Sequence, residues 1–232
     1  MTLCKKKGFT LAEVLIVLAI LGVVAALSTP GIIRNSQNAK IGPSLARICT
    51  TIETAIQAAC HEQERYSFKD IVNVDSSPED LTIANKFDYL AKNFMRAKNY
   101  NGTIPPIYNM KNESYDDKVD KTATLIFADK SLIILPSCTM GSSTDGEGNV
   151  TTVDMCEAYA VVSGFQGKKK LVLGQDVFPL MITADGYVLP PGQAKGEDHS
   201  ADCTDEQIDS KTTDGYYCGD RVANNGWKAD WK

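Results

Sequence analysis

The first thirty residues constrain this chain more than any other stretch. A short head with Lys5, Lys6 and Lys7 precedes an almost wholly apolar run, residues 9–29, which ends at Pro30. A helix of about 21 residues is about 31 Å long, which matches the hydrocarbon core of a bilayer. The lysines favour a cytoplasmic N-terminus. The sequence therefore predicts a single transmembrane helix, with everything after Pro30 exported.

One carboxylate interrupts the apolar run. Glu13 lies five residues into it, where insertion scales put the cost of an acidic side chain at about 2.5–3.5 kcal/mol. Because such a group needs a partner, we interpret Glu13 as functional. The alternative is a glutamate near the helix end whose side chain reaches the lipid headgroups.

The same residues carry a resemblance to a known family. The stretch GFTLAE at residues 8–13, followed by an apolar helix, resembles the class III signal of type IV pilins and type II secretion pseudopilins. The resemblance implies that a prepilin peptidase cuts between Gly8 and Phe9 and methylates the new amino group of Phe9. An ordinary secretory signal would instead be cut after the apolar run, where residues 25–28 (AALS) offer only a loose site.

The resemblance also implies a role for the charge. Glu13 of one subunit would meet the terminal amine of Phe9 on a neighbour and set the axial register of a filament, since a carboxylate among apolar helices must be paired or neutralised. Pro30 and Gly31 are expected to form a helix break, or weak point, because proline removes a hydrogen bond and glycine adds flexibility. The resemblance implies that the helix can locally extend there inside an assembled filament. Implied partners are the prepilin peptidase, an assembly platform membrane protein, an assembly ATPase, and sibling pilins or pseudopilins in a homo- or hetero-polymer.

Composition indicates a folded, acidic head. The 232 residues suffice for one anchor and one domain with a real core. Without a leader that carries three lysines, the formal net charge would change from −5 to −8, which argues against a broad nucleic-acid-binding surface. No G-x-S-x-G, P-loop, H-E-x-x-H or dinucleotide pattern occurs, and neither histidine lies in a recognisable motif, so we expect no enzyme activity.

Cysteine usage agrees with export. Of seven cysteines, Cys4 falls in the leader, and the remaining six form an even set that indicates disulfides in an exported domain. We favour Cys138 with Cys156 and Cys203 with Cys218, because each pair closes a loop dense in Gly, Asp and Thr.

Cys49 and Cys60 are the remaining disulfide candidates. They lie about 16 Å apart along one expected helix, so they cannot bond to each other unless that helix ends before Cys60. Buried free thiols are the alternative for some of the six. Zinc is disfavoured, because no C-x-x-C pair occurs.

Apolar periodicity predicts that the helix continues into the head. The continuation covers residues 30–65, where apolar side chains at three- and four-residue spacing form one stripe that should lie against a sheet. The stripe consists of Ile41, Leu45, Ile48, Ile52, Ile56 and Ala59. At Gly42 and Pro43 two alternatives are equally open: a kink or short gap in the helix, and a continuous curved helix. A cap at Ser77 and a proline at 78 predict a second helix to about Lys98.

The rest of the head reads as strands and loops. The segment after the second helix, from the breakers Asn101-Gly102 and Pro105-Pro106 to Asp120, and residues 140–149 are expected to be loops. The polar tail from Pro190 is expected to be held by Cys203 and Cys218, with Trp227 back on the core. The expected strands are residues 123–128, 132–136, 158–162, 177–183 and 186–189, in two hairpins with one strand between them.

No cofactor is expected, with calcium the one metal left open. Asp145, Glu147 and Asn149 alternate like the opening of a calcium loop, but Val150 replaces the required glycine and no glutamate stands at the twelfth place. An acidic surface turn is the alternative. The aspartates of the tail are open to the same two interpretations, calcium ligands or an acidic surface; they are Asp198, Asp202, Asp205 and Asp209.

Together these patterns predict an α+β protein with one membrane anchor, and the resemblance implies a pilin-like structural subunit in a bacterial inner membrane. We expect a leader at residues 1–8, a transmembrane assembly helix at 9–29, its amphipathic continuation at 30–65 and an exported head at 66–232. The filament would be a type II secretion pseudopilus or a type IV pilus, in the periplasm or at the cell surface. The alternative is a membrane-tethered exported binding module that does not polymerise.

Overall fold

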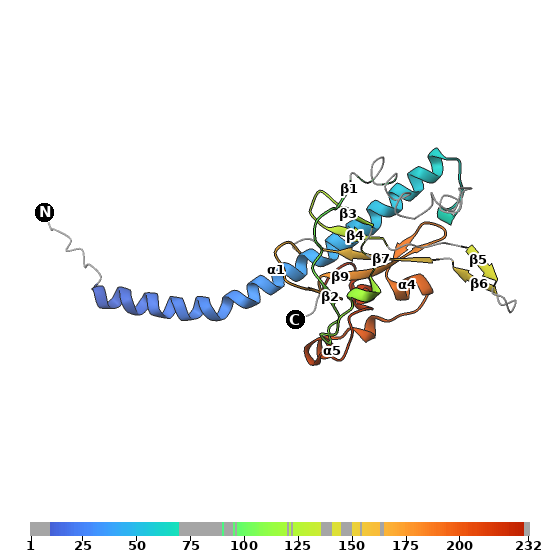
Figure 1. The fold of residues 1–232 in the computed structure, drawn as a ribbon. Helices are drawn as coiled ribbons and strands as arrows, with labels where there is room; N and C mark the ends of the chain where they lie inside the picture. The colour runs from blue at the N-terminus through green and yellow to red at the C-terminus, as the bar shows by residue number, and fades with distance from the viewer. Residues whose placement is uncertain are drawn as a thin grey trace.

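The architecture is one long helix followed by a mostly antiparallel β-sheet domain, which confirms the predicted α+β class (Figure 1). The computed structural model describes residues 10–69, 97–119, 121, 123–135, 141–144, 150–153, 155–162 and 165–229, with Leu90 and Met95. Within these ranges, side chains are described except at residues 27–37, 141–144 and 150–153.

Helix α1 (Leu11–Glu62) is continuous over 52 residues. The helix break expected at Pro30 and Gly31 is therefore absent from the single chain, whereas local extension there inside a filament remains a prediction. The open question at Gly42 and Pro43 is settled in favour of a continuous helix. A proline removes its own N–H donor and its ring crowds the carbonyl four residues before it, and a long helix can absorb both effects by bending. Figure 1 shows α1 curving between a first half that extends away from the domain and a second half that lies along it.

The second half of α1 buries the predicted apolar stripe. All six stripe residues are buried, and they pack against side chains of the main sheet in one core cluster. Two polar contacts fix the helix on the sheet. Arg47 pairs with Asp129 at 2.5 Å, and Glu53 accepts a hydrogen bond from the backbone N–H of Val188 at 2.9 Å. This last contact covers the outer edge of the sheet with a helix, a common way to block unwanted strand pairing.

The main sheet has six antiparallel strands in the order β1-β3-β4-β7-β9-β10. Their bounds are β1 Lys98–Asn99, β3 Thr124–Ile126, β4 Leu132–Ile134, β7 Met155–Val161, β9 Val177–Thr183 and β10 Val188–Leu189. Both predicted hairpins are confirmed, β3 with β4 and β9 with β10. Strand β7 begins three residues earlier than predicted, because all seven of its residues pair with β9.

Both faces of this sheet are buried. Ile133 and Ala158 face α1, whereas their chain neighbours Leu132 and Tyr159 join a second cluster on the opposite face. That face is covered by a two-stranded parallel sheet, β2 (Ile107–Tyr108) and β8 (Leu171–Val172), and by the 3-10 helix η2 (Asp116–Lys118). The prediction that residues up to 120 form only loop is therefore wrong: Ile107 is fully buried and its strand pairs with a segment far along the chain.

A third hairpin was also missed. Strands β5 (Gly141–Thr144) and β6 (Val150–Val153) pair antiparallel where residues 140–149 were predicted to form a loop. Figure 1 shows this hairpin projecting away from the main sheet. Its serines and threonines resemble loop composition, yet threonine and valine are also good strand formers.

The polar tail folds into short helices. These are α4 (Pro191–Lys195), η3 (Ser200–Asp202), α5 (Asp205–Ser210) and α6 (Cys218–Asn224). Ile208 and Val222 anchor them in the main core, and Trp227 packs against that core as predicted. Most of the helix predicted up to Lys98 lies outside the described residues; Leu90 is helical and fully buried, and Lys98 itself begins β1.

The close approach of α1 to the C-terminal segment makes a testable prediction at Gly42. A Cβ atom there would lie 1.9 Å from the backbone oxygen of Trp227, so Gly42→Ala must push the segment and the helix apart. We expect a loss of about 1–3 kcal/mol in the free energy of unfolding, measured by chemical denaturation of the full chain in detergent.

The matched control is Gly22→Ala in the same helix, where an added Cβ meets nothing within 4 Å. Alanine is the better helix former by about 1 kcal/mol, so this variant should be neutral or slightly stabilised. Equal stability of the two variants would contradict the predicted clash.

Candidate functional site

The N-terminal turn of α1 forms a capping box around Glu13. Thr10 is the N-cap residue, and its hydroxyl accepts a hydrogen bond from the backbone N–H of Glu13 at 3.3 Å. In return, the Glu13 carboxylate accepts hydrogen bonds from the backbone N–H and from the hydroxyl of Thr10, each at 2.8 Å. This reciprocal pairing satisfies two N–H groups that have no acceptor inside the helix. Glu13 is thus held at the start of the helix by its own chain.

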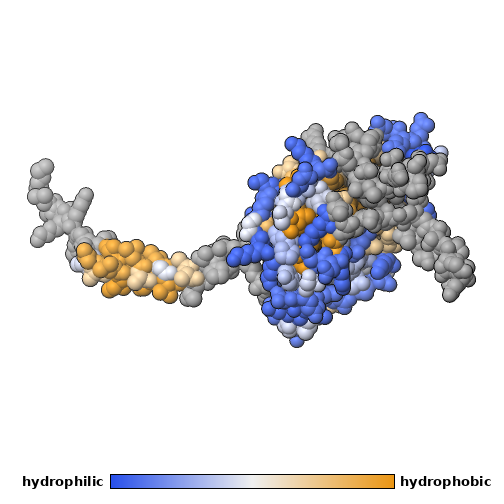
Figure 2. Space-filling view, in the orientation of Figure 1, coloured by the Kyte–Doolittle hydropathy of each residue, from blue (hydrophilic) through white to orange (hydrophobic). Residues whose placement is uncertain are grey.

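Beyond this turn, α1 exposes a continuous apolar surface. Large hydrophobic side chains between residues 11 and 24 are 47% to 78% exposed, and Figure 2 shows a mostly hydrophobic stretch apart from the domain. They are Leu11, Val14, Leu15, Ile16, Val17, Leu18, Ile20, Leu21, Val23 and Val24. An apolar surface of this extent marks a site of contact with a membrane or with other protein chains.

No helix within the described part of the chain meets both the length and the hydrophobicity that a membrane span requires.

The sequence-predicted processing site is only partly placed. Gly8 and Phe9 lie outside the described residues, so the predicted pairing of Glu13 with an amine of Phe9 remains a prediction. Sequence reasoning missed the role of Thr10, although the pattern T-x-x-E ahead of an apolar run is a known capping signal.

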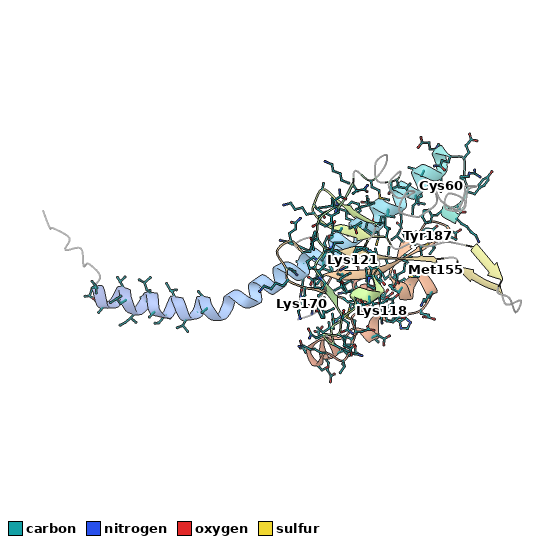
Figure 3. The ribbon with its side chains drawn as sticks, in the orientation of Figure 1. Cys60, Lys118, Lys121, Met155, Lys170 and Tyr187 are labelled. Carbon is teal, nitrogen blue, oxygen red and sulfur yellow. A yellow bond between two sulfur atoms is a disulfide. The ribbon has the colours of Figure 1, made fainter. Side chains whose placement is uncertain are left out.

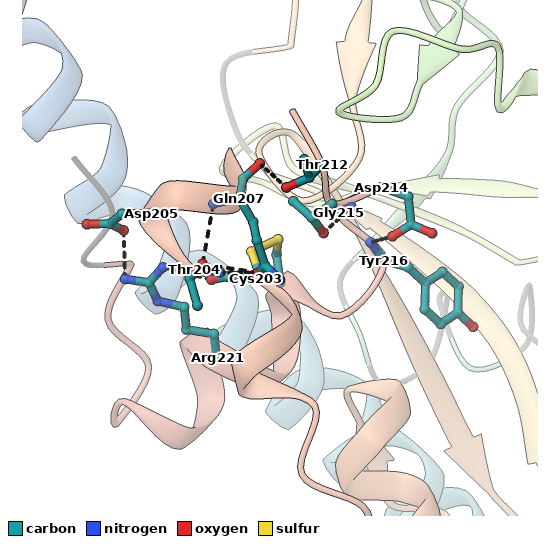
Figure 4. The surroundings of a disulfide bond; sticks show 11 residues. Cys203, Thr204, Asp205, Gln207, Thr212, Asp214, Gly215, Tyr216 and Arg221 are labelled. Carbon is teal, nitrogen blue, oxygen red and sulfur yellow. Dashed lines mark hydrogen bonds and ion pairs between the residues drawn. A yellow bond between two sulfur atoms is a disulfide. The ribbon is translucent and has the colours of Figure 1, made fainter. Parts of the chain in front are cut away.

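One predicted disulfide is formed in the C-terminal region. Cys203 and Cys218 are bonded, both fully buried, with their Cα atoms 5.0 Å apart (Figure 4). Arg221 donates to the backbone oxygen of Cys203 at 2.7 Å and to the carboxylate of Asp205 at 2.9 Å. Next to Cys203, Thr204 caps α5. The bond therefore joins η3, α5 and α6 into one unit.

The other cysteines give a mixed outcome. Cys156 is disulfide-bonded, and its predicted partner Cys138 lies outside the described residues. Cys49 is a buried free thiol, which corrects its status as a disulfide candidate. Burial, and then the nearby Glu53, raise the pKa of Cys49 to about 12. Cys60 lies near the far end of α1 and is not bonded to Cys49, because an intact helix separates them (Figure 3).

Three of the four tail aspartates proposed as calcium ligands are engaged with neighbouring protein groups. Asp198 accepts from Ser200 and Asn224, Asp202 contacts His199, and Asp205 pairs with Arg221. Among the residues with described side chains, no group of three or more His, Cys, Asp or Glu is arranged to hold a metal ion. The other calcium candidates, Asp145, Glu147 and Asn149, lie outside the description.

Comparison with known proteins places a motif on this site. Residues 3–29 match the family model of the prokaryotic N-terminal methylation motif. No curated protein and no solved structure matches the chain. The match covers the predicted cleavage site, the capping box and the exposed apolar half of α1. The chain therefore carries, at residues 3–29, the prokaryotic N-terminal methylation motif, which is the class III signal of type IV pilins.

Proposed function

We propose that the chain is the precursor of a pilin-like structural subunit that polymerises through its N-terminal helix. The observation that carries this proposal is the methylation motif at residues 3–29, placed directly on a helix half whose large apolar side chains are 47% to 78% exposed. Such a surface needs a lipid or protein environment. The filament would be a type II secretion pseudopilus or a type IV pilus.

Processing and assembly would follow from the same few residues. A prepilin peptidase would cut between Gly8 and Phe9 and methylate Phe9, which leaves a positive charge one residue before the helix cap. The precursor would sit in the bacterial inner membrane with its N-terminus in the cytoplasm and its head exported. During assembly, with a platform protein and an ATPase, the Glu13 carboxylate would pair with the amine of a neighbouring subunit among apolar helices, where an unpaired charge is very costly.

The head would have a mechanical role. The second half of α1 is fixed to the sheet by a buried stripe, an ion pair and an edge hydrogen bond. A pull on the helix would therefore reach the whole domain. Disulfide-clamped loops would supply the outer surface and the contacts with sibling subunits.

A second candidate is a membrane-tethered exported binding module. It is favoured by the capping box, because Thr10 hydrogen-bonds one oxygen of the Glu13 carboxylate without any neighbouring subunit. In that case α1 would be only an anchor, and Glu13→Leu would be tolerated.

The N-terminus of the mature protein tests the proposal. The full chain would be expressed in a bacterial host with and without a prepilin peptidase, and the membrane-bound product analysed by intact mass and N-terminal peptide mapping. We expect N-methylated Phe9 as the first residue only when the peptidase is present. A chain that still begins at Met1 in its native cell, or one that begins near Ser28, would contradict the proposal.

A further inference from the structure

The C-terminal region contains a histidine held between two carboxylates. The Nδ1 atom of His199 lies 2.7 Å from Asp202, and its Nε2 atom lies 2.8 Å from Glu197. The side chain is 28% exposed. A neutral imidazole carries one N–H, so it can donate to only one of these carboxylates and would turn a lone pair toward the other. Only the doubly protonated imidazolium fits both contacts.

The same ring packs on helix α6. His199 stacks on Tyr217, the residue that precedes α6, with ring centroids 4.1 Å apart and planes inclined by 20°. The adjacent residue Asp198 accepts a hydrogen bond from Asn224 of α6 at 3.0 Å. The loop around His199 is thus attached to both ends of α6.

A buried carboxylate of α6 faces this loop. Asp220 is fully buried, and its Oδ1 accepts from the backbone N–H of Gln193 in the first turn of α4 at 2.9 Å. Its Oδ2 has no hydrogen-bond partner among the described residues. Burial raises the pKa of Asp220, while the backbone N–H groups of Gln193 and Gly192, and after them the nearby His199, oppose that rise. The cation on His199 therefore also offsets the charge of this buried group.

We propose that His199 is a proton-controlled clasp, which holds residues 197–202 against α6 when the imidazole is doubly protonated and releases them when it is neutral. The acidic groups that face the ring are Glu197, Asp198 and Asp202 on its own loop and Asp220 on α6. The cation next along α6, Arg221, is engaged by Cys203 and Asp205. Loss of the His199 proton would remove the positive charge that partly offsets the negative charges of these four carboxylates. The clasp needs only the folded head, so it does not depend on assembly.

The direction of the pH response follows from linkage. The contacts with Glu197 and then with Asp202 raise the pKa of His199 in the folded chain. The stabilisation they provide is complete below the ordinary histidine pKa of about 6.5 and is lost as the pH rises through the raised folded value. The clasp is closed in mildly acidic medium and opens on the alkaline side.

Hydrogen–deuterium exchange of the full chain in detergent micelles tests the clasp. Exchange would be measured at about pH 6 and about pH 8.5 and corrected for intrinsic exchange rates. Protection of residues 197–202 and 218–224 should be up to about tenfold lower at the higher pH. His199→Gln should show the low protection at both pH values. The matched control is His61→Gln, at the exposed end of α1, which should keep the wild-type response.

A second variant keeps the test independent of folding defects. Glu197→Gln with Asp202→Asn retains the imidazole and its stacking on Tyr217 but removes the two charges. By proton NMR, the imidazole signal that His199→Gln removes should titrate above about pH 6.5 in the wild type and should move back toward that value in the double variant. The proposal is overturned if the wild-type protection does not change with pH, if His199→Gln keeps the wild-type response, or if the titration midpoint is unaffected by the double variant.

Discussion

Glu13→Gln is expected to abolish incorporation of this chain into filaments while membrane insertion and peptidase cleavage continue. Glutamine fits the N3 position of a capping box as well as glutamate does, so its amide oxygen can still accept from the N–H and hydroxyl of Thr10. The substitution therefore keeps the local helix start and removes only the charge. If the charge pairs with a neighbouring amine in an apolar bundle, its loss costs about 3–5 kcal/mol per contact.

That cost corresponds to a factor of about a hundred or more in the equilibrium constant of each association step, since about 1.4 kcal/mol changes such a constant tenfold. Sheared filaments and membranes would be separated and the chain quantified in each fraction. Glu53→Gln is the matched control: it makes the same chemical change in the same helix, where the amide oxygen can still accept from Val188. Wild-type incorporation of Glu13→Gln would contradict the assembly role and would leave the capping box as the whole function of Glu13.

The main architecture was predictable because its signals are local and repeated. One stripe of apolar residues from Ile41 to Ala59 recurs at helical spacing, and it is buried as predicted. The hairpins of the main sheet were predictable for a similar reason: Asp129 and Ser131 form a compact turn in which the aspartate accepts from the serine N–H and hydroxyl. Such turns are encoded within a few residues.

The missed elements depend on partners far along the chain. Strand β2 pairs with β8, and Ile107 meets Leu171 there; isolated apolar residues between polar ones leave no periodic signal. The helix break expected at Pro30 is absent because a local signal was given too much weight. A local penalty was weighed without the long helix on either side, which continues through it.

The candidate site was predictable only where a motif is contiguous. Residues 8–13 carry the processing signal, and Glu13 stands out because it is a single charge in an apolar run. The His199 cluster was not visible in the sequence. Glu197 and Asp202 are close to it along the chain, but Tyr217 and Asp220 are brought to it only by the folding of α6, which the disulfide helps to hold.

The second large effect is expected from removal of that disulfide. The double variant Cys203→Ala with Cys218→Ala should lose about 3 kcal/mol in the free energy of unfolding, the value for a cross-link that closes a loop of about 15 residues. The bond spans 15 positions and both sulfurs are fully buried. Alanine is preferred to serine because a buried hydroxyl without a partner would add its own penalty. Urea denaturation of the full chain in detergent, without reductant, measures the loss.

The comparison that isolates the cross-link is Cys49→Ala, which truncates a buried cysteine that has no disulfide. Each truncation should cost about 1 kcal/mol or less through lost contacts, so the double variant must lose clearly more than twice the cost of the control. The excess should appear mainly around α5 and α6, because Ile208 and Val222 enter the main core from this unit. If the double variant loses no more than two such truncations, residues 203–218 are held by packing alone, and the disulfide contributes little to the stability of the head.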